Sequence, residues 1–236
     1  MNELTLLNRI FNLSESACMF DAKQLYALND ITSRRGLTLT REQAVEVAKT
    51  RSQALYENER VEIGVGATDK IIRTFSSSSY ANARNWAEIV LEIVERFYFI
   101  KSEVHDAISD NELIDFMYHT FENVCGGALE MLADETEELI RHLNAGGSVD
   151  IEAEIDLSLK IDTVFLLDSI AAPSERAAVY NKLSDCYFDI KKQIGGTMND
   201  YAILGGMYQE YLSCGGTLDG QSAERVMKLL KGDPQE

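Results

Sequence analysis

The amino-acid sequence predicts an all-α or nearly all-α protein, a bundle of seven to nine helices, and three observations lead to this fold class. First, no proline occurs before Pro173, and the only other one is Pro234, so helical hydrogen bonding is uninterrupted by proline over the first 172 residues. Second, apolar residues recur three and four positions apart along several segments, as on the buried side of a helix. Third, strand-like alternation is confined to two short stretches, residues 61–65 and 149–161.

The N-terminal third is expected to contain three helices followed by a loop. Residues 16–33 form the first helix. The second begins after Thr40, which stands three residues before Gln43 in the spacing of a capping box. Residues 67–75 form a short third helix. The serines at 76–79 predict a loop, because serine side chains compete with the helix for backbone hydrogen bonds.

The strongest helical pattern lies in residues 82–105. Apolar residues there follow alternating spacings of four and three, namely Trp86, Val90, Ile93, Phe97, Ile100 and Val104. Such a seam is typical of a helix in a bundle. Other apolar residues widen the seam, namely Ile89, Leu91, Val94 and Phe99. We therefore expect this helix to be buried on more than one side.

A further helix is predicted to begin at Ser109, which has capping-box spacing to Glu112. Its apolar stripe runs through Ile114, Met117, Phe121, Val124, Ala128 and Met131. The glycine pair at 126–127 interrupts this stripe. Because each glycine costs about 1 kcal/mol in a helix relative to alanine, we expect another backbone to approach closely at this pair.

The helical pattern stops at residues 144–148, a glycine-containing stretch that makes the best domain boundary in the chain. We predict an N-terminal helical domain, residues 1–145, and a C-terminal helical region, residues 148–236. The sequence leaves open whether the two pack as one unit.

Residues 149–161 depart from the helical pattern, because apolar and polar residues alternate strictly along them. One interpretation is a small two-stranded β-ribbon in which residues 149–155 pair with residues 61–65, which also alternate. The other is a loop that leads into a helix from Asp156, with Leu157, Ile161, Val164 and Phe165 facing inward. The sequence does not decide between them.

The C-terminal region is expected to contain a helix at 174–193, directly after Pro173, and a last helix at 221–231 with Asp219 as its cap. Between them, glycine doublets recur every ten residues, at 195–196, 205–206 and 215–216. We interpret the outer doublets as helix ends and the middle doublet as part of a helix that packs closely against a neighbour.

The composition is strongly acidic, with 39 acids, 22 bases and a net charge of −17. A field of this sign repels phosphate backbones and anionic lipid surfaces, so we expect no nucleic acid and no membrane as partners. The N-terminus lacks the basic and apolar regions of a signal peptide. Four widely spaced cysteines predict free thiols in a reducing cytoplasm, and hence a cytoplasmic location.

Residues that could carry chemistry are few. No phosphate-cradling, metalloprotease or nucleophile-elbow motif occurs, so we predict no cofactor. If residues 149–161 are a strand, one face carries four carboxylates that could collect a calcium or magnesium ion, namely Asp150, Glu152, Glu154 and Asp156. Arg73 and Arg84 flank the serine loop and, with Tyr80, could hold an anionic ligand there.

Several motifs in the N-terminal domain are similar to those of a known family. They are Leu39-Thr-Arg-Glu-Gln-Ala44, Arg60-Val-Glu-Ile-Gly64, Arg96-Phe-Tyr-Phe-Ile-Lys101, Glu112-Leu-Ile-Asp-Phe-Met117 and Gly127-Ala-Leu-Glu130. With them, residues 36–146 resemble an uncharacterised bacterial protein family, a domain of unknown function. This resemblance implies no catalytic residue.

Amphipathic helices, the lack of a catalytic constellation and the acidity together favour a non-enzymatic interaction or regulatory protein, with a protein partner or self-association. The alternative is a small-ligand-binding protein or an enzyme with an interhelical pocket.

Overall fold

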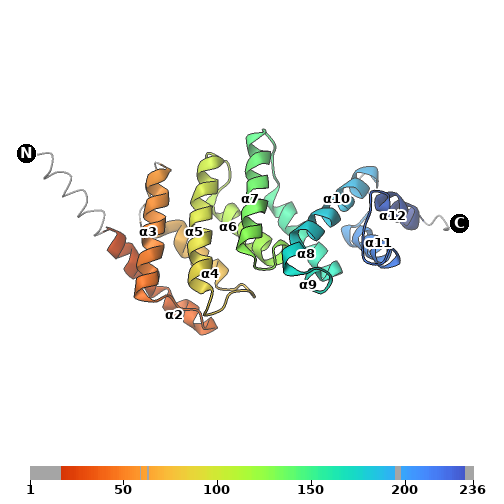
Figure 1. The fold of residues 1–236 in the computed structure, drawn as a ribbon. Coiled ribbons are helices and arrows are strands. Elements are labelled where there is room, and N and C mark those ends of the chain that lie inside the picture. Colours follow the sequence, from red (N-terminus) through yellow and green to blue (C-terminus); the bar gives the residue numbers. More distant parts are fainter. Residues whose placement is uncertain (1–16, 59, 63, 195–197, 232–236) are drawn as a thin grey trace, which may run out of the picture. The chain divides into compact units, whose positions relative to one another are not determined.

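A computed structural model of the chain describes residues 17–58, 60–62, 64–194 and 198–231. Within these ranges every regular element is helical (Figure 1), so the predicted all-α class is confirmed. Eleven α-helices, α2 to α12, have both ends in the described part, more than the seven to nine predicted. The excess has a simple origin. Two of these helices are single turns of four residues, and one predicted helix is divided by a glycine turn.

The chain divides into two compact units. Unit 1 comprises Met1–Tyr118 and Ala133–Ser148, and unit 2 comprises His119–Leu132 and Val149–Glu236. The boundary placed at residues 145–148 from the sequence stays a prediction. None of the helices in the described ranges combines the length and the apolar composition that crossing a bilayer requires. All four cysteines are free thiols.

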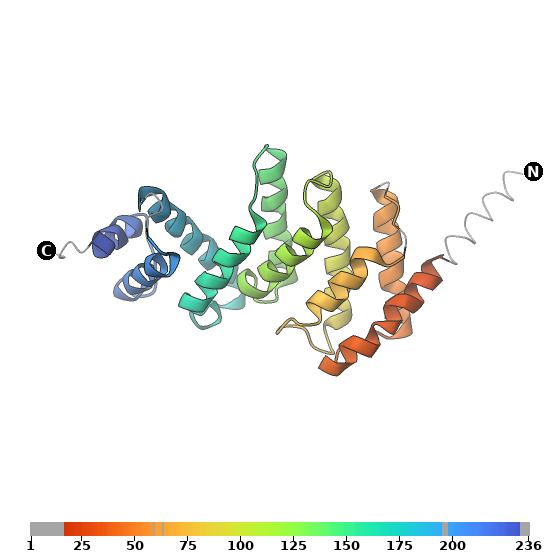
Figure 2. The ribbon, with the colours of Figure 1, turned by 180° about the vertical axis from the view of Figure 1, so that it is seen from behind.

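Unit 1 is built from two layers of helices. Helices α3 (Arg41–Glu57), α5 (Trp86–Glu103) and the unit 1 part of α7 (Leu129–Asn144) lie side by side in one layer (Figure 1). The other layer, seen in front in Figure 2, consists of residues 17–27, α2 (Asn29–Thr32), α4 (Gly66–Phe75) and α6 (Asp110–His119). Each pair of consecutive helices thus contributes one helix to each layer.

Helix α5 is the centre of unit 1, since it packs against both α3 and α4. Its buried residues are Trp86, Ile89, Val90, Ile93, Val94, Phe97, Tyr98, Ile100 and Lys101. The expected burial on more than one side is confirmed. The expectation for Phe99 is wrong, because 42% of this side chain is exposed. Phe99 falls one position outside the buried arc, on the stripe that carries the glutamates.

The two capping boxes predicted at helix starts are both present. Thr40 Oγ1 accepts a hydrogen bond from the Gln43 amide at 3.2 Å, and the Gln43 side chain accepts one from the Thr40 amide at 2.8 Å. Ser109 and Glu112 form the same reciprocal pair at 3.3 and 3.1 Å. Each box satisfies amides that the first turn of the helix leaves without a partner.

The predicted β-ribbon is wrong on both strands. On the first, Val61, Glu62 and Gly64 lie in coil and turn, Ile63 lies outside the described residues, and Gly64 has φ +72°. On the second, residues 151–155 belong to α8 (Ile151–Phe165). The alternating residues also fit the spacing of a helix. The apolar residues buried on one side of α8 are Ile151, Leu157, Ile161 and Phe165. The helix begins five residues before the alternative that started at Asp156.

A buried guanidinium replaces the ribbon as the link between the 60–65 segment and the helices. Arg51 of α3 is only 2% exposed. Its Nη1 lies 3.0 Å from Asp21 Oδ2, and its Nη2 lies 3.2 Å from Glu62 Oε2 and 2.5 Å from the Gly64 carbonyl oxygen. The Tyr98 hydroxyl of α5 donates to Glu62 at 2.7 Å. Two carboxylates and a turn carbonyl are therefore satisfied by one side chain.

The helix predicted from Ser109 divides into two. After α6, residues Thr120–Val124 form a π-helical turn, and Gly126 and Gly127 then adopt φ +58° and +83°, which ends the helical run. Helix α7 starts afresh and ends at Asn144, where the sequence predicted a stop. At Gly126 the close approach is made by the Arg176 side chain.

Unit 2 is a cluster of helices around α8. Besides α8 it contains α9 (Leu167–Ile170), the 3₁₀ turn η3 (Pro173–Glu175), α10 (Arg176–Ile194), α11 (Asp200–Ser213) and α12 (Ser222–Lys231). Helix α8 packs on the π-helical turn, α10 and α11, and α12 packs on α10 and α11. Pro173 occupies the first position of η3, where its missing N–H does no harm.

Arg176 satisfies the π-helical turn from the inside of unit 2. It is 2% exposed, and its Nε and Nη2 donate to the Asn123 carbonyl oxygen at 3.2 and 2.9 Å. The same guanidinium forms ion pairs with Asp162, at 3.1 Å, and with Asp168. A Cβ on Gly126 would lie 2.8 Å from Arg176 Cδ. This glycine therefore makes room for the buried arginine.

The other glycine doublets behave as predicted where they are described. Gly206 lies within α11, and a Cβ there would meet Leu230 at 3.0 Å and Val226 at 3.2 Å, so α11 and α12 pack closely at this point. Gly215 and Gly216 follow the end of α11 with φ +71° and +88°. The doublet at 195–196 lies outside the described residues.

The glycines of unit 2 provide a matched test of this packing. Gly126→Ala should destabilise the protein by about 1–2 kcal/mol, because alanine is strained at positive φ and its Cβ would press on Arg176. Gly205→Ala should stabilise it by about 0.5–1 kcal/mol, because this helical position has open space. Urea unfolding followed by circular dichroism measures both changes. Shifts of the same sign in the two variants would contradict the proposed role of Gly126.

Candidate functional site

The carboxylates predicted as a metal site lie on a helix, so their common strand face does not exist. Asp150 is the N-cap of α8 and accepts a hydrogen bond from the Ala153 amide at 3.0 Å. Asp156 forms an ion pair with Lys160. Residues two apart on a helix differ by about 200° in direction, which separates Glu152 from its neighbours in the pattern. Among the described residues, no group of three His, Cys, Asp or Glu side chains is arranged to hold a metal ion.

Of the two arginines predicted as an anion site, Arg73 lies before the loop that joins α4 to α5, and Arg84 lies near the end of that loop. Arg73 is in the last turn of α4, and its Nε and Nη2 donate to Asp69 at 2.7 and 3.1 Å, which makes a surface ion pair. Arg84 is exposed, and its side chain has no hydrogen bond or ion pair with any described residue. Tyr80 is half-buried. The two arginines thus differ in how free they are to bind a ligand.

The serine loop, residues 76–85, is held in shape by its own side chains. Ser76 Oγ donates to the Arg73 carbonyl oxygen at 2.7 Å. The Tyr80 amide donates to Ser78 Oγ at 3.1 Å, and Asn85 Nδ2 donates to the Tyr80 carbonyl oxygen at 3.0 Å. These contacts are the turn-forming hydrogen bonds that serine and asparagine favour.

A third arginine contacts this loop and was not predicted from the sequence. Arg35, at the end of the 3₁₀ turn η1 (Ser33–Arg35), donates from Nη1 to Ser76 Oγ at 3.0 Å. The two residues are 41 positions apart, so no local pattern could have joined them. Only the adjacent basic pair Arg34–Arg35 was visible in the sequence.

The outer side of α5 and α7 in unit 1 forms a second candidate, which we call the acidic face. On α5 a single exposed stripe contains Glu88, Glu92, Glu95, Phe99 and Glu103. On α7 the exposed acids of unit 1 are Asp134, Glu137 and Glu138. Arg96 Nη1 lies 3.9 Å from Glu137 Oε1 and so links the two helices.

Few positive charges balance this face. The Arg96 guanidinium lies over the Phe99 ring, with its Cζ 5.5 Å from the ring centroid. On α7, Arg141 pairs with Glu138 at 2.5 Å. Within the described residues, Glu88, Glu92 and Glu95 have no ion-pair partner. The stripe on α5 is therefore a continuous anionic surface with one exposed aromatic ring.

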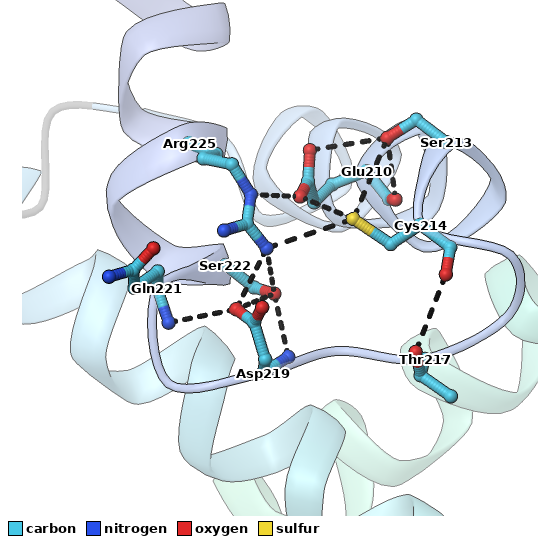
Figure 3. Close-up of polar contacts among 8 residues, drawn as sticks. All are labelled: Glu210, Ser213, Cys214, Thr217, Asp219, Gln221, Ser222 and Arg225. Carbon is cyan, nitrogen blue, oxygen red and sulfur yellow. Dashed lines mark hydrogen bonds and ion pairs between the residues drawn. The ribbon is translucent and has the colours of Figure 1, made fainter.

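A third candidate lies in unit 2, where a group of polar side chains joins the end of α11 to the start of α12 (Figure 3). Glu210 is 2% exposed. It forms an ion pair with Arg225 Nε and accepts a hydrogen bond from Cys214 Sγ at 2.9 Å. Arg225 Nη2 lies 3.7 Å from the same sulfur and 2.8 Å from Asp219 Oδ1.

Asp219 performs the capping role predicted for it. Its Oδ1 accepts a hydrogen bond from the Gln221 amide at 2.9 Å, and its own amide donates to Ser222 Oγ at 2.8 Å. Figure 3 shows that Arg225 reaches from α12 to both this cap and Glu210. The connection between α11 and α12 is thus closed by one arginine that neutralises two carboxylates.

The chemistry of this group is that of a structural joint with an accessible thiol. Burial by itself would raise the pKa of Glu210, but hydrogen bonds from Cys214 and Arg225 outweigh it, so the pKa lies below its ordinary value of 4.5. Cys214 is exposed, whereas Cys125 is buried and burial raises the pKa of Cys186 to about 11. Sequence spacing gives no signal for this group, because Glu210 and Arg225 are 15 residues apart on different helices.

Acid titration can test the joint. A carboxyl group with a lowered pKa in the folded state stabilises the protein above its unfolded pKa, and this contribution is lost as the pH falls through the folded pKa. Glu210→Gln should therefore lower the free energy of unfolding at pH 7 by about 1–3 kcal/mol and flatten its fall between about pH 6 and 3. Urea unfolding at a series of pH values measures both effects.

The matched control for this experiment is Glu224→Gln, which removes an exposed carboxylate from α12. It should keep the pH dependence of the unmodified protein. If both variants have the same pH profile, Glu210 does not have the assigned role.

Comparison with known proteins places most of unit 1 in a family. A model described as a family of unknown function (DUF6323) matches residues 24–149. The match includes the serine loop and the acidic face and stops before the joint at Cys214. No curated protein and no solved structure matches the chain. The resemblance inferred for residues 36–146 lies inside the matched range and is confirmed. The chain therefore belongs to this family of unknown function.

Proposed function

We propose that the protein is a non-enzymatic interaction protein whose acidic face binds a basic segment of another protein. The exposed stripe on α5 carries this proposal. From Glu88 to Glu103 it spans 16 residues, or about 22 Å along the helix axis. This length suits a basic helix of about four turns, or an extended segment of about seven residues.

The competing explanation for the glutamates on α5 is an ordinary solvated helix surface. The pattern of charges along the stripe argues against this explanation. Exposed helix faces commonly pair opposite charges one turn apart, as Asp69 and Arg73 do on α4. On α5, Glu88 and Glu92 are four residues apart and carry the same charge. Such a like-charged pair is unfavourable by about 0.2–0.5 kcal/mol. A cationic partner would remove this repulsion, so binding such a partner would stabilise the stripe.

The expected mode of binding combines charge with one apolar contact. Each exposed ion pair contributes only about 0.2–1 kcal/mol, so several must form together. Their sum depends on salt, because charges are screened over about 8 Å at physiological ionic strength. Phe99 supplies an apolar surface between Glu95 and Glu103, and Arg96 over its ring holds it in place.

Neutralising the stripe tests the proposal. The triple variant Glu88→Gln, Glu92→Gln and Glu95→Gln should fold with unchanged or slightly higher stability, since it removes like-charge repulsion. Its affinity for a labelled, lysine-rich amphipathic 15-residue peptide should fall by about tenfold, which corresponds to about 1.4 kcal/mol. Fluorescence anisotropy with the full chain at 0.05 and 0.15 M salt measures the affinity and its salt dependence.

The control changes the net charge equally at exposed acids of unit 2, through Glu152→Gln, Glu175→Gln and Glu224→Gln. It should bind the peptide within about twofold of the unmodified protein, because none of these acids belongs to the stripe on α5. Equal losses in the two triple variants would mean that only the overall charge attracts the peptide, and the proposal would then fail.

A further inference from the structure

We propose that Phe99, with Glu95 and Glu103 on either side of it, forms a subsite of the acidic face that selects arginine over lysine in the partner. This inference rests on the proposed function, and it names the side chain that the partner presents to the exposed ring. The stripe of glutamates by itself requires only positive charge. The ring between two carboxylates adds a requirement for a planar cation.

The three residues of the subsite lie in a row along α5. Glu95 precedes Phe99 by four positions and Glu103 follows it by four, and residues four apart are neighbours on one face of a helix. Both glutamates are exposed, and 42% of the Phe99 side chain is exposed. Within the described residues neither glutamate has an ion-pair partner. The ring therefore has an available carboxylate on each side along the helix axis.

A guanidinium from the chain itself already lies over this ring. The Cζ of Arg96 is 5.5 Å from the centroid of Phe99, within the distance of about 6 Å at which a cation is attracted to an aromatic face. One guanidinium covers only one face of a ring, and the exposed part of Phe99 remains open to a second planar group. An exposed phenylalanine alone would indicate little. Its contact with Arg96 shows that the ring accepts a guanidinium.

The Arg96 side chain is held loosely enough to make room for a partner. Its Nη1 lies 3.9 Å from Glu137 Oε1, which is long for an ion pair, and more than half of the Glu137 side chain is exposed. Exposed pairs of this kind contribute little to stability. Arg96 can therefore shift towards α7 without a large loss of energy.

The chemistry of the subsite favours arginine over lysine. A guanidinium is planar and weakly hydrated, and its five N–H donors point outward in its own plane. When it stacks on Phe99, it can donate to Glu95 on one side and to Glu103 on the other. The lysine ammonium is compact and strongly hydrated, so it gains less from the ring. We expect arginine to bind about threefold more tightly per site, as an exposed cation–π contact allows.

The competing explanation is that Phe99 contributes only apolar area. Two substitutions separate the explanations. Phe99→Leu keeps an apolar side chain and removes the ring, whereas Phe99→Tyr keeps the ring. Because Phe99 lies outside the buried arc of α5, both variants should fold normally, and their thermal unfolding by circular dichroism checks this.

The experiment compares two labelled 15-residue amphipathic peptides that differ only in having lysine or arginine at every basic position. Fluorescence anisotropy with the full chain at 0.15 M salt gives the ratio of the two dissociation constants. We expect the unmodified protein to prefer the arginine peptide. Phe99→Leu should lower the ratio by about threefold, through weaker binding of the arginine peptide, and Phe99→Tyr should keep it.

Phe188→Leu is the matched control, since it makes the same substitution at a ring of α10 that is 49% exposed in unit 2. It should leave the ratio unchanged. The inference is overturned if Phe99→Leu keeps the ratio, if Phe99→Tyr loses it, or if Phe188→Leu lowers it equally.

Failure of this inference can be distinguished from failure of the proposed function. If both peptides bind more weakly to the triple glutamine variant of α5 but their ratio does not depend on Phe99, the acidic face binds basic segments without selecting arginine. If the triple variant affects neither peptide, the acidic face is not the binding surface, and both proposals fail.

Discussion

The burial of α5 is the constraint on which the rest of unit 1 depends. Apolar side chains on two sides of this helix must leave water, and each fully buried aliphatic or aromatic residue contributes about 1.5–3 kcal/mol when it does. One neighbour cannot cover both sides, so α3 and α4 pack on it from different directions. The two-layered arrangement follows from this demand. A single stripe of α5 remains in water, and it is the stripe that carries the glutamates and Phe99.

Two buried arginines hold the irregular segments that helices alone cannot stabilise. Arg51 satisfies the turn at Gly64 in unit 1, and Arg176 satisfies the carbonyl of Asn123 in the π-helical turn of unit 2. In both cases carboxylates balance the buried charge, which would otherwise be strongly unfavourable. Arginine suits this role because its planar group donates several hydrogen bonds in fixed directions.

Much of the negative charge on the surface of unit 1 lies on one stripe of α5, and this arrangement links the structure to its proposed function. Acids occupy the exposed stripe of α5, whereas Arg35 contacts Ser76 in the loop that precedes the same helix. A buried helix with one free side presents such groups in a fixed geometry, and ligands lose little affinity to reorganisation there. The joint at Cys214 in unit 2 differs, because its charges satisfy one another and close the connection between α11 and α12.

The sequence by itself determined the helical class, the ends of several helices and the serine loop, because these depend on local spacing and capping. Thr40 with Gln43, Ser109 with Glu112, and the seam from Trp86 to Val104 were all readable within a few turns. Strict alternation at 149–161 left both a strand and a helix possible, because the same residues fit either spacing. Only packing against neighbouring helices selects the helix. Contacts between distant residues were decided by tertiary structure alone. Arg35 with Ser76, Arg51 with Glu62 and Glu210 with Arg225 meet because apolar faces bring their helices together, and no local pattern encodes those meetings.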